Sequence, residues 1–272
     1  MTIFFDYEGV MEVPYRPSLN MNSVTRVILK ILDRFGADST FNVVGRVAQL
    51  HPDLIREISE SGHEVASHSW MHDNVAHLSV SMLRSMLTRT SATLEKCTGH
   101  EVVGFRSPWL LSNQHLHSTL KELGYIWVSN VYSNYFPERF LRPGIQSAPV
   151  FSQNLAYGAA RILRKIYRED PRIVDGLIQI PMLSPMDGQL LGMVNPEQET
   201  PPHLVDYMAR SVLNEMKRTK LLFNINLHDW IIGTMNRPEI LDKILTRMTE
   251  EFDVRFVTAT QIAQRATKKY VL

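Results

Sequence analysis

Residues 2–9 read TIFFDYEG, an apolar run that leads directly into two acidic residues, Asp6 and Glu8. Comparable apolar runs recur along the 272-residue chain, at 39–44, 63–67, 102–106, 125–129, 177–181, 221–227 and 254–258. Runs this short are typical of buried strands rather than of buried helices. The sequence therefore predicts a series of buried strands, of which 2–6 is the first.

Segments with helical periodicity lie between most of these runs. Clear examples are residues 23–36, 78–97 and 202–218. Glycines close several helical segments, at positions where a left-handed residue ends a helix most easily, namely Gly36, Gly62, Gly99 and Gly124. Because each crossover between parallel strands must place a helix on the outside of the sheet, seven or eight such units favour a parallel α/β barrel. A doubly wound open sheet is the alternative.

The composition is that of an ordinary globular protein, with 44% hydrophobic and 21% charged residues. We expect one domain over residues 1–272, with an insertion at about 131–176, where aromatic residues and a basic run break the strand and helix rhythm. If its apolar residues are exposed, this insertion would suit a homo-oligomer. A formal net charge of +1 excludes a global field for nucleic acid or anionic membranes, so we expect no nucleic-acid partner.

The cysteine content limits the kinds of metal site that this chain can build. Cys97 is the only cysteine, which excludes an intramolecular disulfide and any cysteine-based zinc cluster. Any metal must therefore be held by histidines and carboxylates. No stretch has the charge and apolar pattern of a signal peptide, and no window is apolar enough for a membrane span. A cytoplasmic protein is the expectation.

Polar residues follow several of the expected strands directly. They are Asp6, Glu8, His68, His72, Arg106 and His228. Because the carboxyl ends of barrel strands meet at one mouth, these side chains are expected to converge there. A catalytic zinc ion typically takes three histidine or carboxylate ligands and leaves one position open. The sequence therefore predicts a metal site. The helical zinc-protease motif is not its source, because Ser67 stands where that motif needs its second histidine.

At these residues the sequence resembles the polysaccharide deacetylase family, the carbohydrate esterases with a nodulation-protein-type deacetylase domain. FFDYEG resembles the family's first motif, HSWMH its metal motif, GFRSPW its Arg-x-Pro motif and INLHDW its final Leu-His motif. The resemblance covers most of the chain. It implies a deformed parallel (β/α) barrel of about seven strands and a divalent metal ion, with zinc the expected ion.

The resemblance also implies a role for each motif residue. Asp6 is the general base that activates the water molecule at the metal, and Arg106 holds Asp6 through a charge-assisted pair. Glu8, His68 and His72 are the implied metal ligands. His228 is the implied acid that protonates the leaving amine. The backbone N–H near Trp109 is the implied oxyanion donor.

The chain departs from the family pattern in two places. Tyr7 separates Asp6 from Glu8, whereas most members have two adjacent aspartates, so either acid could be the metal ligand. This spacing resembles a branch that includes peptidoglycan deacetylase-like and allantoinase-like amide hydrolases. The second departure is at 125–134, where the family's fourth motif has an aspartate that orients the acid histidine and this chain has none. Asp175 or Asp187 could replace it.

Three hypotheses about function follow. The first is a metal-dependent hydrolase that removes an N-acetyl group from an acetamido sugar or glycan precursor. The second keeps the chemistry and changes the substrate to a non-sugar amide, a formamide or a ureide. The third is a catalytically inactive carbohydrate-binding homologue. Trp70, Trp109 and Trp230 each lie beside a motif residue, and each could either stack on a sugar ring or pack at the rim.

Overall fold

The computed structural model describes residues 1–9, 19–131, 170–182, 187–188, 198–217 and 222–270. Its strands are β1 (Thr2–Tyr7), β2 (Thr40–Val43), β3 (Glu64–Ser67), β4 (Gly104–Arg106), β5 (Trp127–Ser129), β6 (Arg172–Val174), β7 (Leu177–Gln179) and β8 (Asn224–His228). Its α-helices are α1 (Met21–Arg34), α2 (Gly45–Leu50), α3 (Pro52–Glu60), α4 (Val80–Thr98), α5 (Leu116–Glu122), α8 (Pro202–Met216), α9 (Asp229–Ile232), α10 (Pro238–Glu251) and α11 (Ala259–Tyr270). Two 3-10 helices are η1 (Val75–His77) and η2 (Pro108–Leu110).

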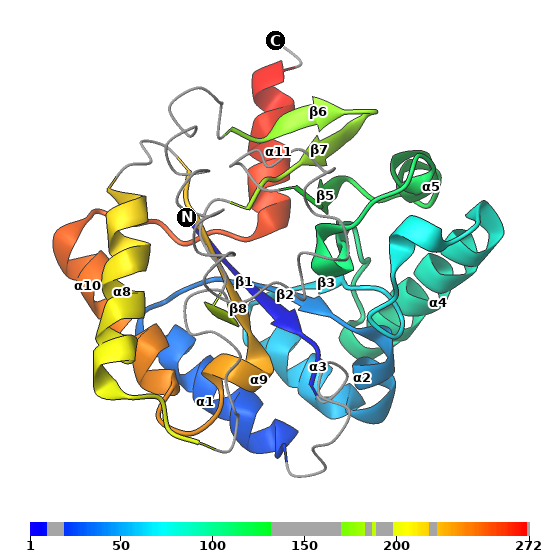
Figure 1. The fold of residues 1–272 in the computed structure, drawn as a ribbon. Helices are drawn as coiled ribbons and strands as arrows, with labels where there is room; N and C mark the ends of the chain where they lie inside the picture. The colour runs from blue at the N-terminus through cyan, green and yellow to red at the C-terminus, as the bar shows by residue number, and fades with distance from the viewer. Residues whose placement is uncertain (10–18, 132–169, 183–186, 189–197, 218–221, 271–272) are drawn as a thin grey trace.

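The strands form one sheet with the order β6-β7-β5-β4-β3-β2-β1-β8 (Figure 1). All recorded pairs of neighbours are parallel except β6 with β7, which is antiparallel. The predicted α/β fold with parallel strands is confirmed. Over the part of the chain that the structure describes, the sheet is not closed, because β6 and β8 stand at its two ends.

Side chains alternate along each strand between the two faces of the sheet. In β1, Ile3, Phe5 and Tyr7 belong to the large hydrophobic core that the strands share with the surrounding helices. The residues between them, Phe4 and Asp6, therefore point to the opposite, inner face. This alternation decides which residues of every strand can reach a site on the inner face.

A second, smaller hydrophobic cluster fills the inner face near the beginnings of the strands. It contains Phe4, Trp127 and Ile178 together with apolar residues of α11. The helix α11 contacts β5 and β7 and lies over this end of the sheet (Figure 1). Glu64 anchors it, because one carboxylate oxygen accepts from the Thr260 backbone N–H at 3.0 Å and the other from the Trp127 indole N–H at 3.0 Å. The inner face is thus apolar and covered at the amino ends of the strands.

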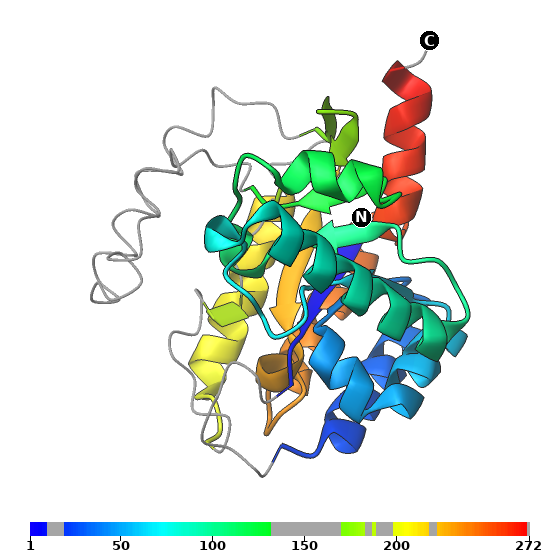
Figure 2. The same ribbon diagram turned by 90° about the vertical axis from the view of Figure 1, so that its right-hand side faces the viewer.

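Helices cover the outer face of the sheet, as the alternation of strands and helices requires (Figure 2). The large core draws residues from α1, α3, α4 and α10. Local signals set the helix ends: the Asn20 side chain accepts from the Ser23 N–H and caps α1, and Gly99, at φ 74°, ends α4. No helix in the described ranges is both long and apolar enough to cross a membrane.

Residues 254–258 were expected to form a strand, and this prediction is wrong, since they adopt no regular structure. The Met1 amino group donates to the Arg255 carbonyl, and the Val257 N–H donates to the Met1 carbonyl. This short contact does not continue as a ladder.

The insertion predicted at 131–176 lies mainly outside the described residues, over 132–169. Its last part includes β6, which pairs with β7.

The contact between Gly104 and Trp127 supports a stability prediction. A Cβ atom at position 104 would lie 2.1 Å from Cε2 of the Trp127 indole, so the Gly104→Ala variant must displace a fully buried ring. We expect a loss of about 1–3 kcal/mol in the free energy of unfolding, measured by denaturant titration. The double variant with Trp127→Phe should lose less than the sum of the two single variants, because phenylalanine removes the clashing atoms. Simple additivity would contradict this account.

Candidate active site

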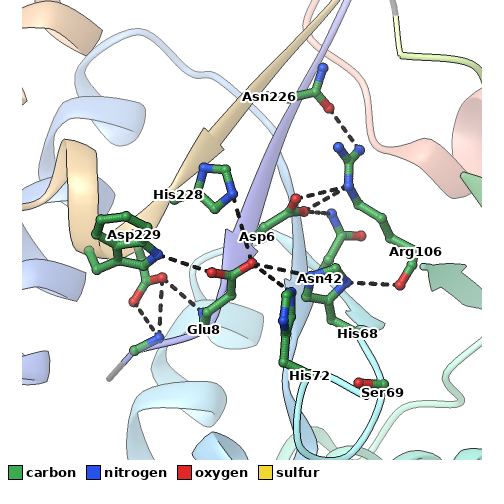
Figure 3. A network of polar contacts seen from close by, with 12 residues as sticks. Asp6, Glu8, Asn42, His68, Ser69, His72, Arg106, Asn226, His228 and Asp229 are labelled. Atoms are coloured by element: carbon green, nitrogen blue, oxygen red, sulfur yellow. Dashed lines mark hydrogen bonds and ion pairs between the residues drawn. The ribbon is translucent and has the colours of Figure 1, made fainter. Parts of the chain in front are cut away.

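Parallel pairing places three polar residues in one row at the centre of the inner face. Asp6 on β1 is in register with Asn42 on β2 and with His228 at the end of β8. Glu8 follows Asp6 by two positions, and residues two apart on an extended strand point the same way. The carboxyl end of β1 thus brings both acids of the first motif to the same face, where Figure 3 shows them side by side.

Glu8 lies at the centre of a group of three possible metal ligands. Its Oε1 atom is 3.4 Å from His68 Nε2 and 3.2 Å from His72 Nε2. One ligand atom from each of these residues lies within 4.8 Å of the other two, and all three side chains are buried. The two histidines come from the loop after β3, as expected for residues at the carboxyl end of a barrel strand.

A tight turn presents the two histidines to Glu8. Ser69 and His72 both have positive φ angles, 65° and 56°, which few residues other than glycine adopt. Asp73 fixes the turn, because its carboxylate accepts from the Trp70 and Met71 N–H groups at 3.0 and 2.9 Å. Backbone strain of this kind is concentrated at functional sites, where the surrounding structure maintains it.

The donor set fits a divalent cation. His68 Nδ1–H donates to the Arg106 carbonyl at 2.8 Å, which leaves Nε2 as the nitrogen that faces Glu8. Among the residues described, this buried Nε2 atom has no hydrogen-bond partner. A histidine fixed through one ring nitrogen, with the other directed at a carboxylate and a second imidazole, is the usual arrangement of a metal-binding histidine.

Asp6 has a different environment from Glu8. Arg106 Nε donates to its carboxylate at 3.0 Å, and the Asn42 side chain donates at 2.8 Å. Arg106 is fully buried, and its Nη1 donates to Asn226 Oδ1 at 2.7 Å. Because the carboxylate of Asp6 is paired with a guanidinium while that of Glu8 faces two imidazoles, the geometry favours Glu8 as the ligand.

His228 is held by a buried carboxylate. Its Nδ1–H donates to Asp187 Oδ1 at 2.6 Å, and its backbone N–H donates to Asp187 Oδ2 at 2.6 Å. The other ring nitrogen, Nε2, lies 3.8 Å from Glu8 Oε1 and faces the metal-ligand group. Of the two acids that could orient this histidine, Asp187 does so, whereas Asp175 contacts His117.

Known proteins with similar sequences place part of this chain in a family. Residues 4–128 match the family model described as polysaccharide deacetylase. Over this region the chain belongs to the polysaccharide deacetylase family. The chain is also similar to the peptidoglycan-N-acetylmuramic acid deacetylase PdaC of Bacillus subtilis, with 30% identity over 105 residues. This alignment covers 39% of this chain and 22% of PdaC.

Solved structures of other proteins have a similar fold. A crystal structure assigned to a polysaccharide deacetylase of Mycobacterium smegmatis superposes with a TM-score of 0.73 at 21% identity, over 99% of this chain and 91% of that one. A CE4 family pseudoenzyme from Bacillus anthracis superposes with a TM-score of 0.58 at 15% identity, over 97% of this chain and 65% of that one. At these identities the likeness concerns the fold.

Electrostatic interactions in this site couple Glu8 to His228. Burial alone would raise the pKa of Glu8, but His228, His68 and His72 outweigh it and hold that pKa well below its ordinary value. Burial would likewise lower the pKa of His228, but the carboxylates of Asp187 and Glu8 raise it well above its ordinary value. The site therefore favours an anionic Glu8 beside a protonated His228.

The three tryptophans beside the deacetylase motifs have different surroundings. Trp109 is 42% exposed, and its ring lies 4.3 Å from that of His72, so it can meet a substrate. Trp70 is buried against Gly45 with the Arg89 guanidinium over its ring, which favours packing over sugar stacking. Trp230 is partly buried, and its indole N–H donates to Glu8 Oε2 at 3.0 Å.

Four polar residues of the site, or their contacts, were not predicted from the sequence. They are Asn42, Asn226, Asp229 and, in its contact with Glu8, Trp230. Strand alternation could have revealed Asn42 and Asn226, since each lies on the inner face of a strand next to β1. Asp229 follows His228 directly. Its buried carboxylate has a pKa raised to about 7, mainly by burial.

Proposed function

We propose that this protein is a metal-dependent hydrolase that removes an N-acetyl group from an acetamido sugar or a glycan precursor. One observation carries the proposal: Glu8 belongs to two groups of closely spaced ligand atoms, one with His68 and His72 and one with Asp6 and His228. A metal-ligand set, a candidate base and a candidate acid therefore adjoin one another. Amide hydrolysis needs these three functions together.

Glu8, His68 and His72 are the residues that would hold the ion. A divalent cation bound there would supply Lewis-acid chemistry, which lowers the pKa of a water molecule and polarises an amide carbonyl. Three ligands from two imidazoles and one carboxylate are typical of a catalytic zinc site with an open position.

Asp6 is the general base in this proposal. Its carboxylate lies on the inner face beside Glu8, within the second group of ligand atoms. Arg106 compensates the buried negative charge and, with Asn42, fixes the orientation of the carboxylate. A base held in this way can accept a proton from an attacking water molecule without reorienting first.

His228 is the general acid. Nδ1–H is engaged by Asp187, so the proton available to a leaving amine is on Nε2, the nitrogen that faces Glu8. The Asp187 carboxylate stabilises the protonated ring. We place the oxyanion beside the metal-ligand set, with the backbone N–H near Trp109 as a further donor.

The substrate class rests on the family and on the relatives. PdaC is a peptidoglycan-N-acetylmuramic acid deacetylase by name. The region of this chain that the family model matches, 4–128, contains Asp6, Arg106 and all three proposed ligands. The exposed indole of Trp109 next to His72 offers a face for a sugar ring. An inactive binding protein is less well supported, since Asp187 provides the acid partner that the fourth motif lacks.

Metal content and acetate release test the proposal together. We expect purified wild-type protein to hold a divalent ion at near one equivalent by elemental analysis, and to release acetate from N-acetylated sugars or chitooligosaccharides. The His68→Ala variant should lose both, because it removes a buried ligand, whereas His77→Ala, at an exposed histidine nearby, should keep both.

The possible outcomes separate the hypotheses. A bound ion with acetate release, both lost in His68→Ala, supports the proposed deacetylase. A bound ion without acetate release from any of these sugars would direct the search to formamides and ureides. Absence of an ion from wild-type protein after dialysis against zinc would refute the mechanism.

A further inference from the structure

We propose that Asp229 and Trp230 are positioning residues that fix Glu8 with only one carboxylate oxygen free for the cation. These two residues follow His228 directly and begin helix α9. The inference rests on the proposed function, since it assigns Glu8 as a metal ligand. It adds a role for the two residues that directly follow the Leu-His pair of the final motif.

The Glu8 side chain has its two oxygens in different environments. Oε2 accepts the Trp230 indole N–H at 3.0 Å, whereas Oε1 faces His68 and His72 at 3.4 and 3.2 Å (Figure 3). Indole is a donor only, so it can occupy one carboxylate oxygen and cannot compete for the ion itself. Glu8 therefore offers only Oε1 to a cation bound between it and the two histidines.

Asp229 holds the backbone of the same residue. Its carboxylate accepts from the Glu8 N–H at 2.9 Å and from the Gly9 N–H at 3.1 Å. Asp229 is fully buried, and Gly9 has a φ of 57°, which glycine adopts easily. The end of β1 is thus fixed by a buried acceptor that binds two successive N–H groups.

Both contacts with Glu8 come from the first two residues of helix α9. α9 begins where β8 ends, and β8 pairs with β1 so that His228 is beside Asp6. This pairing places Asp229 and Trp230 over the end of β1. With its backbone and one oxygen fixed, Glu8 has its carboxylate oriented before an ion binds, which reduces the entropy lost on binding.

Replacement of the donor tests the inference. We expect Trp230→Phe to weaken Zn²⁺ binding to the metal-free protein about 10–100-fold, measured by competition with a chromophoric chelator. Trp127→Phe is the matched control, because it also removes an indole donor 3.0 Å from a glutamate oxygen, that of Glu64, at the opposite end of the strands. This control should lower the melting temperature and leave zinc affinity unchanged.

A spectroscopic readout separates positioning from general loss of structure. Co²⁺ bound to wild-type protein should give a visible absorption spectrum that changes in Trp230→Phe, because the freed Oε2 can then also bind the ion and alter the coordination geometry. Asp229→Asn, which keeps one acceptor oxygen and its size, should weaken zinc binding as well. It provides a second variant if Trp230→Phe does not fold.

The outcomes distinguish this inference from the proposed function. If wild-type protein binds zinc and both Trp230→Phe and Asp229→Asn bind it with unchanged affinity and an unchanged Co²⁺ spectrum, the positioning role is refuted and the metal site stands. Equal losses of zinc affinity in Trp230→Phe and Trp127→Phe would also overturn the inference. If wild-type protein binds no divalent ion, the proposed function itself fails.

Discussion

The Asp6→Asn variant is expected to hydrolyse its substrate with a kcat/KM about 10²–10⁴-fold below that of wild type, while it retains the metal. Asparagine has nearly the same size but cannot accept a proton from water. The metal should remain, because Oε1 of Glu8, not the Asp6 carboxylate, faces His68 and His72. Steady-state kinetics and elemental analysis of the same preparation check both statements.

Glu8→Gln is the matched variant for this prediction. It makes the same chemical change two residues along the strand, and it should lose both the metal and the activity, because an amide is a much weaker ligand than a carboxylate. If the two acids have exchanged roles, Asp6→Asn will lose the metal and Glu8→Gln will keep it. That result would correct the assignment of base and ligand.

Stability must be measured alongside, because Asp6 is buried between two donors. Arg106 and Asn42 both donate to its carboxylate, and an asparagine at this position offers one oxygen and one NH₂ group to them. A pair of facing donors results, which costs about 1–3 kcal/mol if it is not relieved. A melting curve shows whether loss of activity exceeds any loss of folded protein.

The convergence of Asp6, His68, Arg106 and His228 could be predicted from the sequence because it depends on two regular rules. Parallel strands put their carboxyl ends at one edge, and residues two apart on a strand share a face. Each of these four residues ends an apolar run or follows it directly. Their placement therefore depended on the strands alone, and the register between β1 and β8 sets Asp6 beside His228.

The partner of His228 could only be narrowed to two candidates. Asp187 lies in none of the strands, and neither hydrophobic periodicity nor strand order places it. Asp175 was an equal candidate by sequence, yet it lies in the turn between β6 and β7 and pairs with His117. Contacts between side chains far apart in the sequence depend on the whole fold, so local sequence patterns cannot choose between two such candidates.

The tryptophans show a similar limit. Trp70 and Trp109 both stand next to motif residues, yet one is buried and the other is 42% exposed. The difference arises because Gly45 leaves room for the Trp70 ring, while Trp109 has a φ of 50° in the loop after β4. A hydrophobic pattern does not show that a glycine in another helix leaves space for a tryptophan ring. It also does not show that a tryptophan adopts a positive φ angle.

The Asp187→Asn variant is expected to lower kcat about 10²–10⁴-fold on an N-acetyl substrate. The carboxylate of Asp187 accepts Nδ1–H of His228 and stabilises the positive charge of the ring, whereas a neutral asparagine amide carries no negative charge to stabilise it. Asp175→Asn is the matched control, because it alters a second histidine and aspartate pair, His117 with Asp175, away from the metal-ligand group. Its kcat should stay close to that of wild type.

The leaving group provides the sharper test of this last prediction. An amine leaves only after it accepts a proton, whereas a phenolate from an aryl acetate leaves without one. If His228 oriented by Asp187 is the acid, Asp187→Asn should lose far less activity on an aryl acetate than on an N-acetyl sugar. Asp6→Asn should lose activity on both, because attack by water precedes departure in each case. Equal losses on the two substrates would show that Asp187 supports the structure of the site rather than the acid.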